Sequence, residues 1–302
     1  MTRIVSGLAV SCLIFAFEVG GSAGAQSLGP TLQKIKDNQT MTIGFRETSM
    51  PLSYLDGDQK PVGFSVDLCN LVVASVKEKL ALPSLQVKYQ PVTSSTRIPL
   101  ISNGTIDIEC GSTANMIPRQ QQVAFSVTTF APQFRWIARK DSGMNSTTDM
   151  KGKPVILTAG SNTNGFVAKL NSEQGLGLTV LQGKDHAESF LYVATGRAAA
   201  FMEDDILLAG LKANSKSPDD FVFLKDEYPS DPYALMFQKG DASFKALVDD
   251  TLIKLMKSGD YQKLYVRWFE SPIPSQGINL KFPMSGRLKG LIQNPSDKAN
   301  GQ

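Results

Sequence analysis

The sequence has little of what most metal and nucleophilic chemistry depends on. Its 302 residues include three cysteines and one histidine, His186. No C-x-x-C pair and no paired histidine spacing is present. Three cysteines cannot build a disulfide framework, and one histidine leaves little for a zinc site or a catalytic triad. We therefore expect no metal and no cofactor, and most hydrolase and metalloenzyme classes are disfavoured.

Strong charge and long apolar runs are lacking as well. Lys and Arg number 31 against 28 Asp and Glu, a net charge of +3 that gives no sign of a nucleic-acid or anionic-membrane surface. Beyond the N-terminus no segment reaches the ~18 consecutive apolar residues of a membrane-spanning helix. With 42% hydrophobic and 20% charged residues, the composition is that of a globular protein. At ~100–200 residues per domain, the length predicts about two domains.

The N-terminus has the pattern of a targeting signal. Arg3 precedes an apolar stretch over residues 8–17, and Ala-Gly-Ala at 23–25 fits an A-x-A cleavage site. The apolar stretch is too short for the ~20 residues of a membrane anchor. We expect residues 1–25 to be a cleaved signal peptide and the exported protein to begin at Gln26.

The remaining chain alternates strand and helix patterns. Short buried strands are predicted at 41–45, 106–110, 154–158 and 198–202, each followed by a helical pattern. This alternation predicts an α/β fold of mostly parallel sheets covered on both faces. The chain has two plausible crossing points, 128–136 and 226–233. We therefore expect lobe 1 at 26–132 and 231–302, and an inserted lobe 2 at 133–230, with a cleft between them.

Ligands of α/β sheets bind at the carboxyl ends of the strands, where this chain gathers polar side chains. The donors at or beyond predicted strand ends are Arg46, Arg97, Ser112, Thr113, Arg119, Ser161, Asn162 and His186. Asp204 is the one acidic partner in the set. Arginine matches a carboxylate bidentately, so three arginines and an imidazole against one aspartate suit a ligand with two carboxylates and one amine.

Each of these residues also has a plainer interpretation. A lone arginine is usually a surface charge, and His186 can be a surface or capping residue. Asp204 fits the N-cap of the helix that follows it, and Ser112 and Thr113 can satisfy a turn. Only their shared position at strand ends favours the binding site.

Several segments also carry a family resemblance. They include residues 44–49, 93–100, 109–113, 184–186 and 200–202, which read GFRETS, TSSTRIPL, ECGST, KDH and AFM. With these segments in register from Leu32 to about Ala299, the chain resembles the periplasmic glutamate/aspartate-binding proteins of bacterial ABC importers. The resemblance implies the type II two-lobed fold, with each lobe a mostly parallel sheet and two hinge strands between them. It also implies a periplasmic monomer that passes its ligand to a membrane permease and binds no nucleic acid.

The resemblance further implies a role for each site residue. Arg119 and Ser112 would hold the α-carboxylate, and Asp204 would accept from the α-ammonium. The side-chain carboxylate would be surrounded by Arg46, Arg97 and His186, with Ser94 in support. In this role His186 is expected to be an imidazolium whose pKa is raised by the carboxylate.

The chain departs from the family pattern at three positions. Ala114 replaces a hydroxyl residue of close relatives, and Asn162 lies in a loop that is Thr-rich in the family. The preference between glutamate and aspartate therefore stays open, as does another amino or dicarboxylic acid. Leu235 stands where relatives can carry a cysteine, so we expect no bridge from Cys110 to that strand. Whether Cys69 and Cys110 pair with each other is left open.

An enzyme is the main alternative to a binding protein. Some proteins of similar fold are periplasmic dehydratases acting on cyclic dicarboxylates. Here Glu203, Asp185 and His186 are the obvious acid/base candidates, but no paired carboxylates occur at a convincing spacing. A sensory domain is a third possibility, disfavoured because the mature chain shows no membrane span or helix-turn-helix. We expect a solute-binding protein and not an enzyme.

Overall fold

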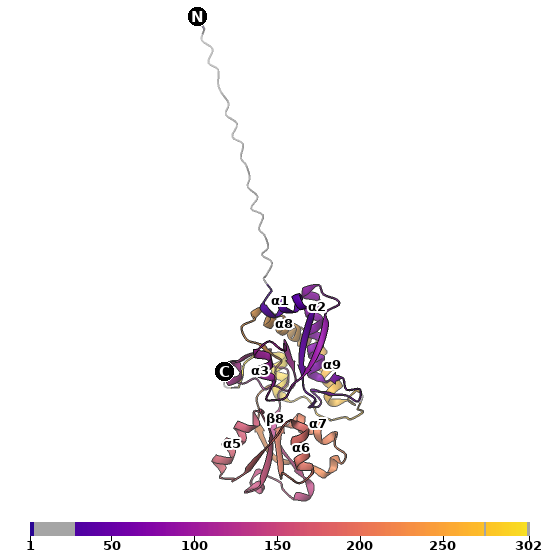
Figure 1. Cartoon of the computed structure of the whole chain (residues 1–302), viewed down its shortest axis with the longest axis vertical. Coiled ribbons are helices and arrows are strands. Elements are labelled where there is room, and N and C mark those ends of the chain that lie inside the picture. The colour runs from indigo at the N-terminus through magenta and orange to yellow at the C-terminus, as the bar shows by residue number, and fades with distance from the viewer. Residues whose placement is uncertain (3–27, 275, 301–302) are drawn as a thin grey trace.

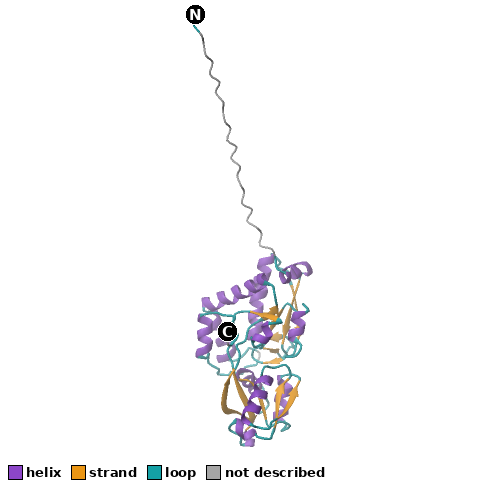
Figure 2. Cartoon of the chain, turned by 90° about the vertical axis from the view of Figure 1, so that its left-hand side faces the viewer, coloured by secondary structure: helices purple, strands orange, loops and turns teal. Residues whose placement is uncertain are grey.

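The computed structural model describes residues 1–2, 28–274 and 276–300 and shows two α/β lobes, one above the other (Figure 1). The predicted signal peptide lies outside the described residues apart from Met1 and Thr2. Within the described part of the chain, no helix is both long and apolar enough to cross a membrane. Figure 2 shows helices packed around the strands of each lobe.

The first lobe is built on a five-stranded mixed sheet. Its strands, in spatial order, are β5 (Gln86–Pro91), β1 (Thr40–Phe45), β6 (Ile108–Cys110), β13 (Met236–Gln238) and β7 (Val123–Phe125). The first three are parallel, and β13 is antiparallel to both of its neighbours. Three short strands, β2 (Thr48–Ser49), β3 (Ser53–Leu55) and β4 (Pro61–Val62), form a small separate sheet.

The helices of this lobe come from both ends of the chain. They are α1 (Pro30–Asn38), α2 (Phe64–Leu80), α3 (Arg97–Ser102), α4 (Ile117–Gln120), α8 (Ala242–Ser258), α9 (Asp260–Tyr265) and α10 (Gly286–Gln293), with a π-helical turn at Val266–Glu270. The helices α1 and α10 were not predicted from the sequence.

The second lobe has a five-stranded sheet of the same design. Its order is β10 (Thr179–Gly183), β9 (Pro154–Thr158), β11 (Ala200–Asp204), β8 (Gln133–Arg139) and β12 (Phe221–Pro229). The first three are parallel, while β8 is antiparallel to β11 and β12. Its helices are α5 (Thr163–Gln174), α6 (His186–Ala194) and α7 (Asp205–Ala213), with 3-10 turns at Lys140–Ser142, Thr147–Met150 and Pro218–Asp220.

The two segments that cross between the lobes run side by side. Ser126 N donates to Leu235 O at 2.9 Å, and Thr129 N donates to Tyr233 O at 2.8 Å. Tyr233 N also donates to Phe130 O at 2.8 Å, so the two segments are paired by hydrogen bonds in both directions. A paired connection of this kind restricts the lobes to hinge motion about the crossing segments.

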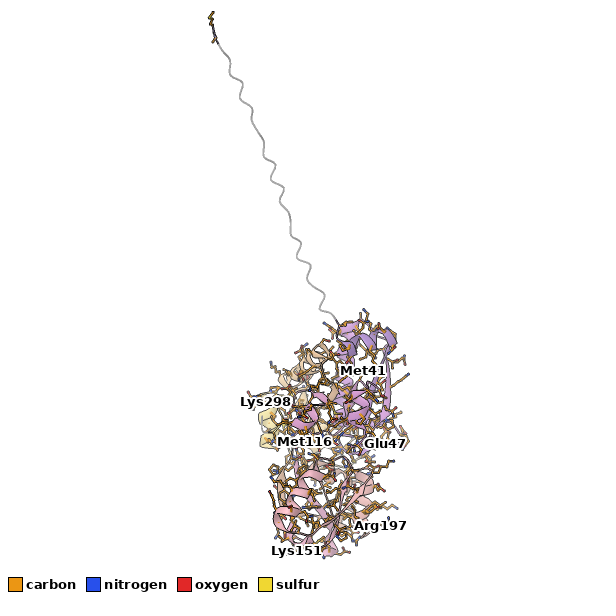
Figure 3. The ribbon with its side chains drawn as sticks, turned by 60° about the vertical axis from the view of Figure 1, so that its left-hand side comes forward. Met41, Glu47, Met116, Lys151, Arg197 and Lys298 are labelled. Atoms are coloured by element: carbon orange, nitrogen blue, oxygen red, sulfur yellow. A yellow bond between two sulfur atoms is a disulfide. The ribbon has the colours of Figure 1, made fainter. Side chains whose placement is uncertain are left out.

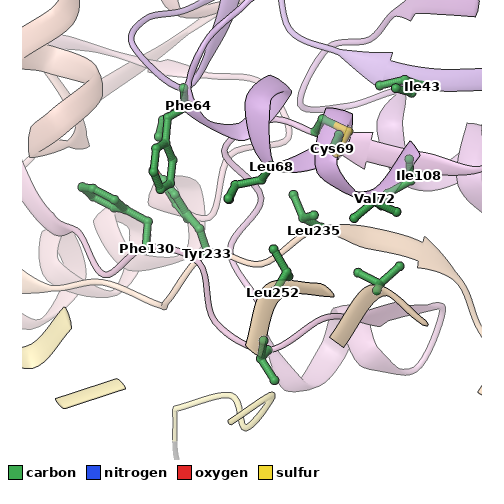
Figure 4. Close-up of a cluster of buried hydrophobic side chains, with 14 of the residues drawn as sticks. Ile43, Phe64, Leu68, Cys69, Val72, Ile108, Phe130, Tyr233, Leu235 and Leu252 are labelled. Carbon is green, nitrogen blue, oxygen red and sulfur yellow. A yellow bond between two sulfur atoms is a disulfide. The ribbon is translucent and has the colours of Figure 1, made fainter. Parts of the chain in front are cut away.

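An aromatic cluster fills the core of the first lobe beside the crossing (Figure 4). The Phe64 and Phe269 ring centroids lie 5.0 Å apart, and those of Phe130 and Phe269 lie 5.2 Å apart. Phe64, the first residue of α2, is fully buried in this cluster. Gly63 permits the turn before it, at φ 136°, since a Cβ would lie 2.3 Å from the Leu52 carbonyl oxygen.

A disulfide joins Cys69 of α2 to Cys110 at the end of β6, with an S–S distance of 1.94 Å. Both cysteines are fully buried, and 41 residues separate them in sequence. A link closing a loop of this length stabilises a fold by about 2–4 kcal/mol. It anchors α2 to the strand end that leads directly into Ser112 and Thr113.

Candidate functional site

The predicted site residues converge between the lobes. The first lobe contributes Arg46 after β1, Arg97 on α3 and Arg119 on α4, and the second contributes His186 at the start of α6 and Asp204 at the end of β11. None of these side chains is more than 9% exposed. Ser94, Ser112, Thr113 and Ser161 are buried as well, and Asn162 is partly buried at the N-terminus of α5.

The lobes touch each other across this cluster. Arg119 Nη2 donates to Gly160 O at 3.2 Å, and Ser95 Oγ donates to Ala159 O at 3.0 Å. Gly160 has φ 78°, and a Cβ there would lie 2.7 Å from Ser95 N. Only glycine allows so close an approach in that backbone conformation. The structure is therefore closed around the cluster.

Arg97 is held by the segment that follows the disulfide. Its Nη1 donates to Ser112 O at 3.2 Å and to Thr113 Oγ1 at 2.7 Å. The Thr113 hydroxyl in turn donates to Glu109 Oε2 at 2.6 Å. This chain fixes the plane of the guanidinium before any ligand is bound, and such preorganisation lowers the cost of binding.

Several donors of the cluster are buried without a hydrogen-bond partner among the described residues. They are Arg46 Nη1, Arg97 Nε and Ser112 Oγ. A buried polar group left unsatisfied costs about 1–3 kcal/mol. Carboxylate oxygen atoms accept hydrogen bonds only, so they are the natural partners for such donors.

Arg46 and Arg119 remain cations at neutral pH despite their burial. Burial first, and then the charge of Arg97, lowers the pKa of Arg46 to about 10 and that of Arg119 to about 9. Arg119 Nη1 also donates to Ala114 O at 3.0 Å. The Ala114 main chain therefore supports Arg119, although its side chain offers no hydroxyl.

Asp204 does not act as a helix cap. It occupies the N-cap position of α7, but its side chain makes no capping hydrogen bond. Its carboxylate instead accepts from Ser230 Oγ at 2.5 Å and from the Tyr233 hydroxyl. The plainer interpretation as a cap is therefore wrong, because the crossing segment holds this carboxylate between the lobes. Burial first, and then Glu203, raises the pKa of Asp204 well above its usual range.

The protein's own side chains lower the pKa of His186, whereas its expected rise beside a ligand carboxylate stays a prediction. Burial first, and then Arg46 and Arg97, lowers the pKa of His186 well below its usual value. Arg46 Nη2 lies 3.4 Å from His186 Nε2 and can only donate, so Nε2 accepts. The ring proton is thereby assigned to Nδ1, which lies 3.1 Å from Thr158 Oγ1. The imidazole is neutral and orients Arg46.

Two buried glutamates of the cluster were not among the predicted ligand residues. Glu109 supports Thr113, and Glu203 Oε2 accepts from Ser161 Oγ at 3.0 Å. Strands covered on both faces are normally apolar throughout, so an acidic residue inside such a strand was the available signal. Ser230 and Tyr233, the partners of Asp204, carried no such signal because a serine and a tyrosine are ordinary residues in a crossing segment. Among the described residues, no group of three or more His, Cys, Asp or Glu side chains could hold a metal ion.

Comparison with known proteins agrees with this geometry. The family model described as bacterial extracellular solute-binding proteins, family 3, matches residues 41–271. The chain is 45% identical to an L-glutamate/L-aspartate-binding protein of Pseudomonas aeruginosa over 99% of both chains. It is 44% identical to a glutamate/aspartate import solute-binding protein of Salmonella typhimurium over 91% of both.

The solved structures show the same architecture. A mutant of ArgBP from T. maritima superimposes with a TM-score of 0.70 at 25% identity, covering 80% of this chain and all of that one. The relatives named above are binding proteins and not enzymes. These similarities agree with the two sheets and the cluster between them. The chain therefore belongs to the bacterial extracellular solute-binding proteins of family 3 and has their two-lobed fold.

Proposed function

We propose that this protein captures L-glutamate or L-aspartate between its lobes and delivers it to the membrane permease of an ABC importer. Residues 1–25 would direct export and be removed, and the protein would act in the periplasm as a monomer. The lobes would comprise 26–132 with 231–302, and 133–230. The sheets support this division, since every strand of the second sheet lies within residues 133–229.

The charge arrangement of the cluster carries the proposal. Three buried guanidinium groups can bind carboxylates, and the buried Asp204 carboxylate, held by Ser230 of the crossing segment, can accept from an amine. In the proposed complex Arg119 and Ser112 bind the α-carboxylate, and Asp204 accepts from the ammonium. Arg46 and Arg97 bind the side-chain carboxylate, with His186 and Ser94 beside them. Thr113, Ser161 and Asn162 complete the lining.

The closed contacts support capture by hinge motion. An open cleft would expose the arginines to water, and closure around a ligand would bring Arg119 to Gly160 and Ser95 to Ala159 as observed. A permease can then distinguish the loaded form by the relative position of the two lobes. No covalent step is needed for this cycle.

A thermal-shift panel of the twenty amino acids and simple dicarboxylates tests the proposal. A ligand at about 100 times its Kd stabilises the folded protein by about 2.7 kcal/mol, which should raise Tm by several degrees. We expect L-glutamate and L-aspartate to give the largest shifts and L-lysine to give none. The largest shift from a neutral or basic amino acid would contradict the proposal. Equal shifts with glutarate, which lacks the amine, would favour the dicarboxylate alternative.

A further inference from the structure

Glu203 is a buried acid that the proposed ligand contacts do not use. Its side chain, on β11, is about as buried as that of Asp204, at 1% exposure. Glu203 Oε2 lies 3.0 Å from Ser161 Oγ and 3.5 Å from His186 Nδ1, while Oε1 accepts from Asp204 N at 3.2 Å. An additional carboxylate among residues that would receive an acidic ligand is unfavourable unless its charge can change.

Charged groups face Glu203 from both lobes and from the crossing segment. These groups are Arg46, Arg97 and Arg119 of the first lobe, His186 and Asp204 of the second, and the Tyr233 hydroxyl. The arginines and two hydrogen bonds lower the pKa of Glu203, but burial is the largest influence and the net pKa is raised. In the closed cleft the carboxyl group therefore binds a proton more readily than in water.

The closed cluster has as many acidic as basic side chains. Its members are Arg46, Arg97 and Arg119 and the acids Glu109, Glu203 and Asp204, so their formal charges sum to zero when all six are ionised. Asp185 and Asp231 add negative charge near Arg46 and Arg119. Glutamate or aspartate carries a net charge of one minus. Closing the lobes over it would bury an uncompensated negative charge, which is costly.

We propose that Glu203 takes up one proton when the acidic amino acid binds and the lobes close. We take Glu203 to be ionised at neutral pH in the open cleft, as a carboxyl group in water is. On closure a proton from solvent binds Oε2, and the new hydroxyl donates to Ser161 Oγ. The Ser161 hydrogen then turns toward Asn162 Oδ1, 3.4 Å away. Capture thereby becomes tighter as the pH falls. The inference rests on the proposed function.

Other groups of the cluster are less suited to take the proton. Asp204 also has a raised pKa, but the ligand ammonium would hold it ionised. His186 lies between Arg46 and the Thr158 hydroxyl with its pKa lowered. Glu203 has no cationic hydrogen-bond partner among the described residues and accepts only from Ser161 and a main-chain N–H, with His186 at 3.5 Å.

Calorimetric titration with L-glutamate in phosphate and in Tris at the same pH measures the proton uptake. These buffers differ in heat of ionisation, so the difference in observed heat gives the number of protons bound. We expect net proton uptake near neutral pH and an affinity that falls as the pH rises. The sign follows because the bound form holds more protons than the free form.

Two variants test whether Glu203 is the group that takes up the proton. Glu203→Gln keeps the shape of the side chain, so it should bind L-glutamate with the uptake lost and the pH dependence flattened. Glu173→Gln, at an exposed acid of the second lobe, is the control and should retain uptake. Binding without uptake in the wild type, or uptake retained in Glu203→Gln, would overturn this inference alone. No binding of either acidic amino acid would overturn the proposed function as well.

If Glu203→Gln fails to bind, infrared difference spectra of the wild type test whether a carboxyl group is protonated on binding. Adding L-glutamate should produce the carbonyl band of a protonated carboxylic acid that shifts in D₂O. Absence of that band would overturn the inference.

Discussion

Replacing Arg97 with alanine is expected to weaken L-glutamate binding at least about tenfold, since a hydrogen bond to a charged group contributes about 1.5–3 kcal/mol. Arg97 is 2% exposed and its guanidinium is fixed by Ser112 and Thr113, so the substitution removes an oriented, buried donor. Affinity for L-glutamine should change less, because its side chain carries no charge. Calorimetric titration with both ligands measures the two effects.

The matched control is Arg197→Ala, because Arg197 is exposed on the second lobe, away from the cluster (Figure 3). It should leave both affinities unchanged. Arg97→Lys should recover only part of the loss, since lysine keeps the charge without the planar fork. Unchanged glutamate affinity in Arg97→Ala would show that Arg97 does not bind the ligand. Equal losses of affinity for both ligands would indicate that Arg97 binds the α-carboxylate.

Asp204→Asn should have the largest effect of any conservative change in the cleft. Truncating or neutralising one partner of a buried, hydrogen-bonded charge pair costs about 2–5 kcal/mol, which corresponds to at least about 30-fold in Kd. The amide can still hydrogen-bond to Ser230 and Tyr233, so the fold should survive. The loss should be confined to ligands with an α-ammonium, and glutarate should bind the variant no more weakly than it binds the wild type.

Parallel titrations of L-glutamate and glutarate test this expectation. Asp219→Asn, an exposed aspartate on the second lobe, is the control and should behave as the wild type. A loss of both ligands to the same degree would mean that Asp204 acts on the hinge and not on the amine.

The elements that position the cluster were largely predictable from local patterns. Buried apolar runs followed by helical periodicity indicated the strands that end at Arg46 and at Ser112. The residues at those ends could be named because ligands of α/β sheets bind there. The resemblance then supplied a role for each of them that their individual chemistry did not.

What remained unpredicted depends on contacts between distant segments. The Cys69–Cys110 pairing requires α2 to lie against the end of β6, which no spacing reveals. The lowered pKa of His186 follows from burial against Arg46 and Arg97, contacts that an expectation based on the ligand carboxylate did not include. Asp204 had the local signature of a cap, and only the crossing segment, through Ser230 and Tyr233, redirects it.

The central claim is that an acidic amino acid binds between the lobes with its carboxylates on the arginines and its amine on Asp204. A crystal structure of the complex with L-glutamate tests it most directly. We predict the α-carboxylate on Arg119, the ammonium on Asp204 and the side-chain carboxylate on Arg46 and Arg97. A ligand outside the cleft, or one whose side-chain carboxylate contacts neither Arg46 nor Arg97, would contradict the account.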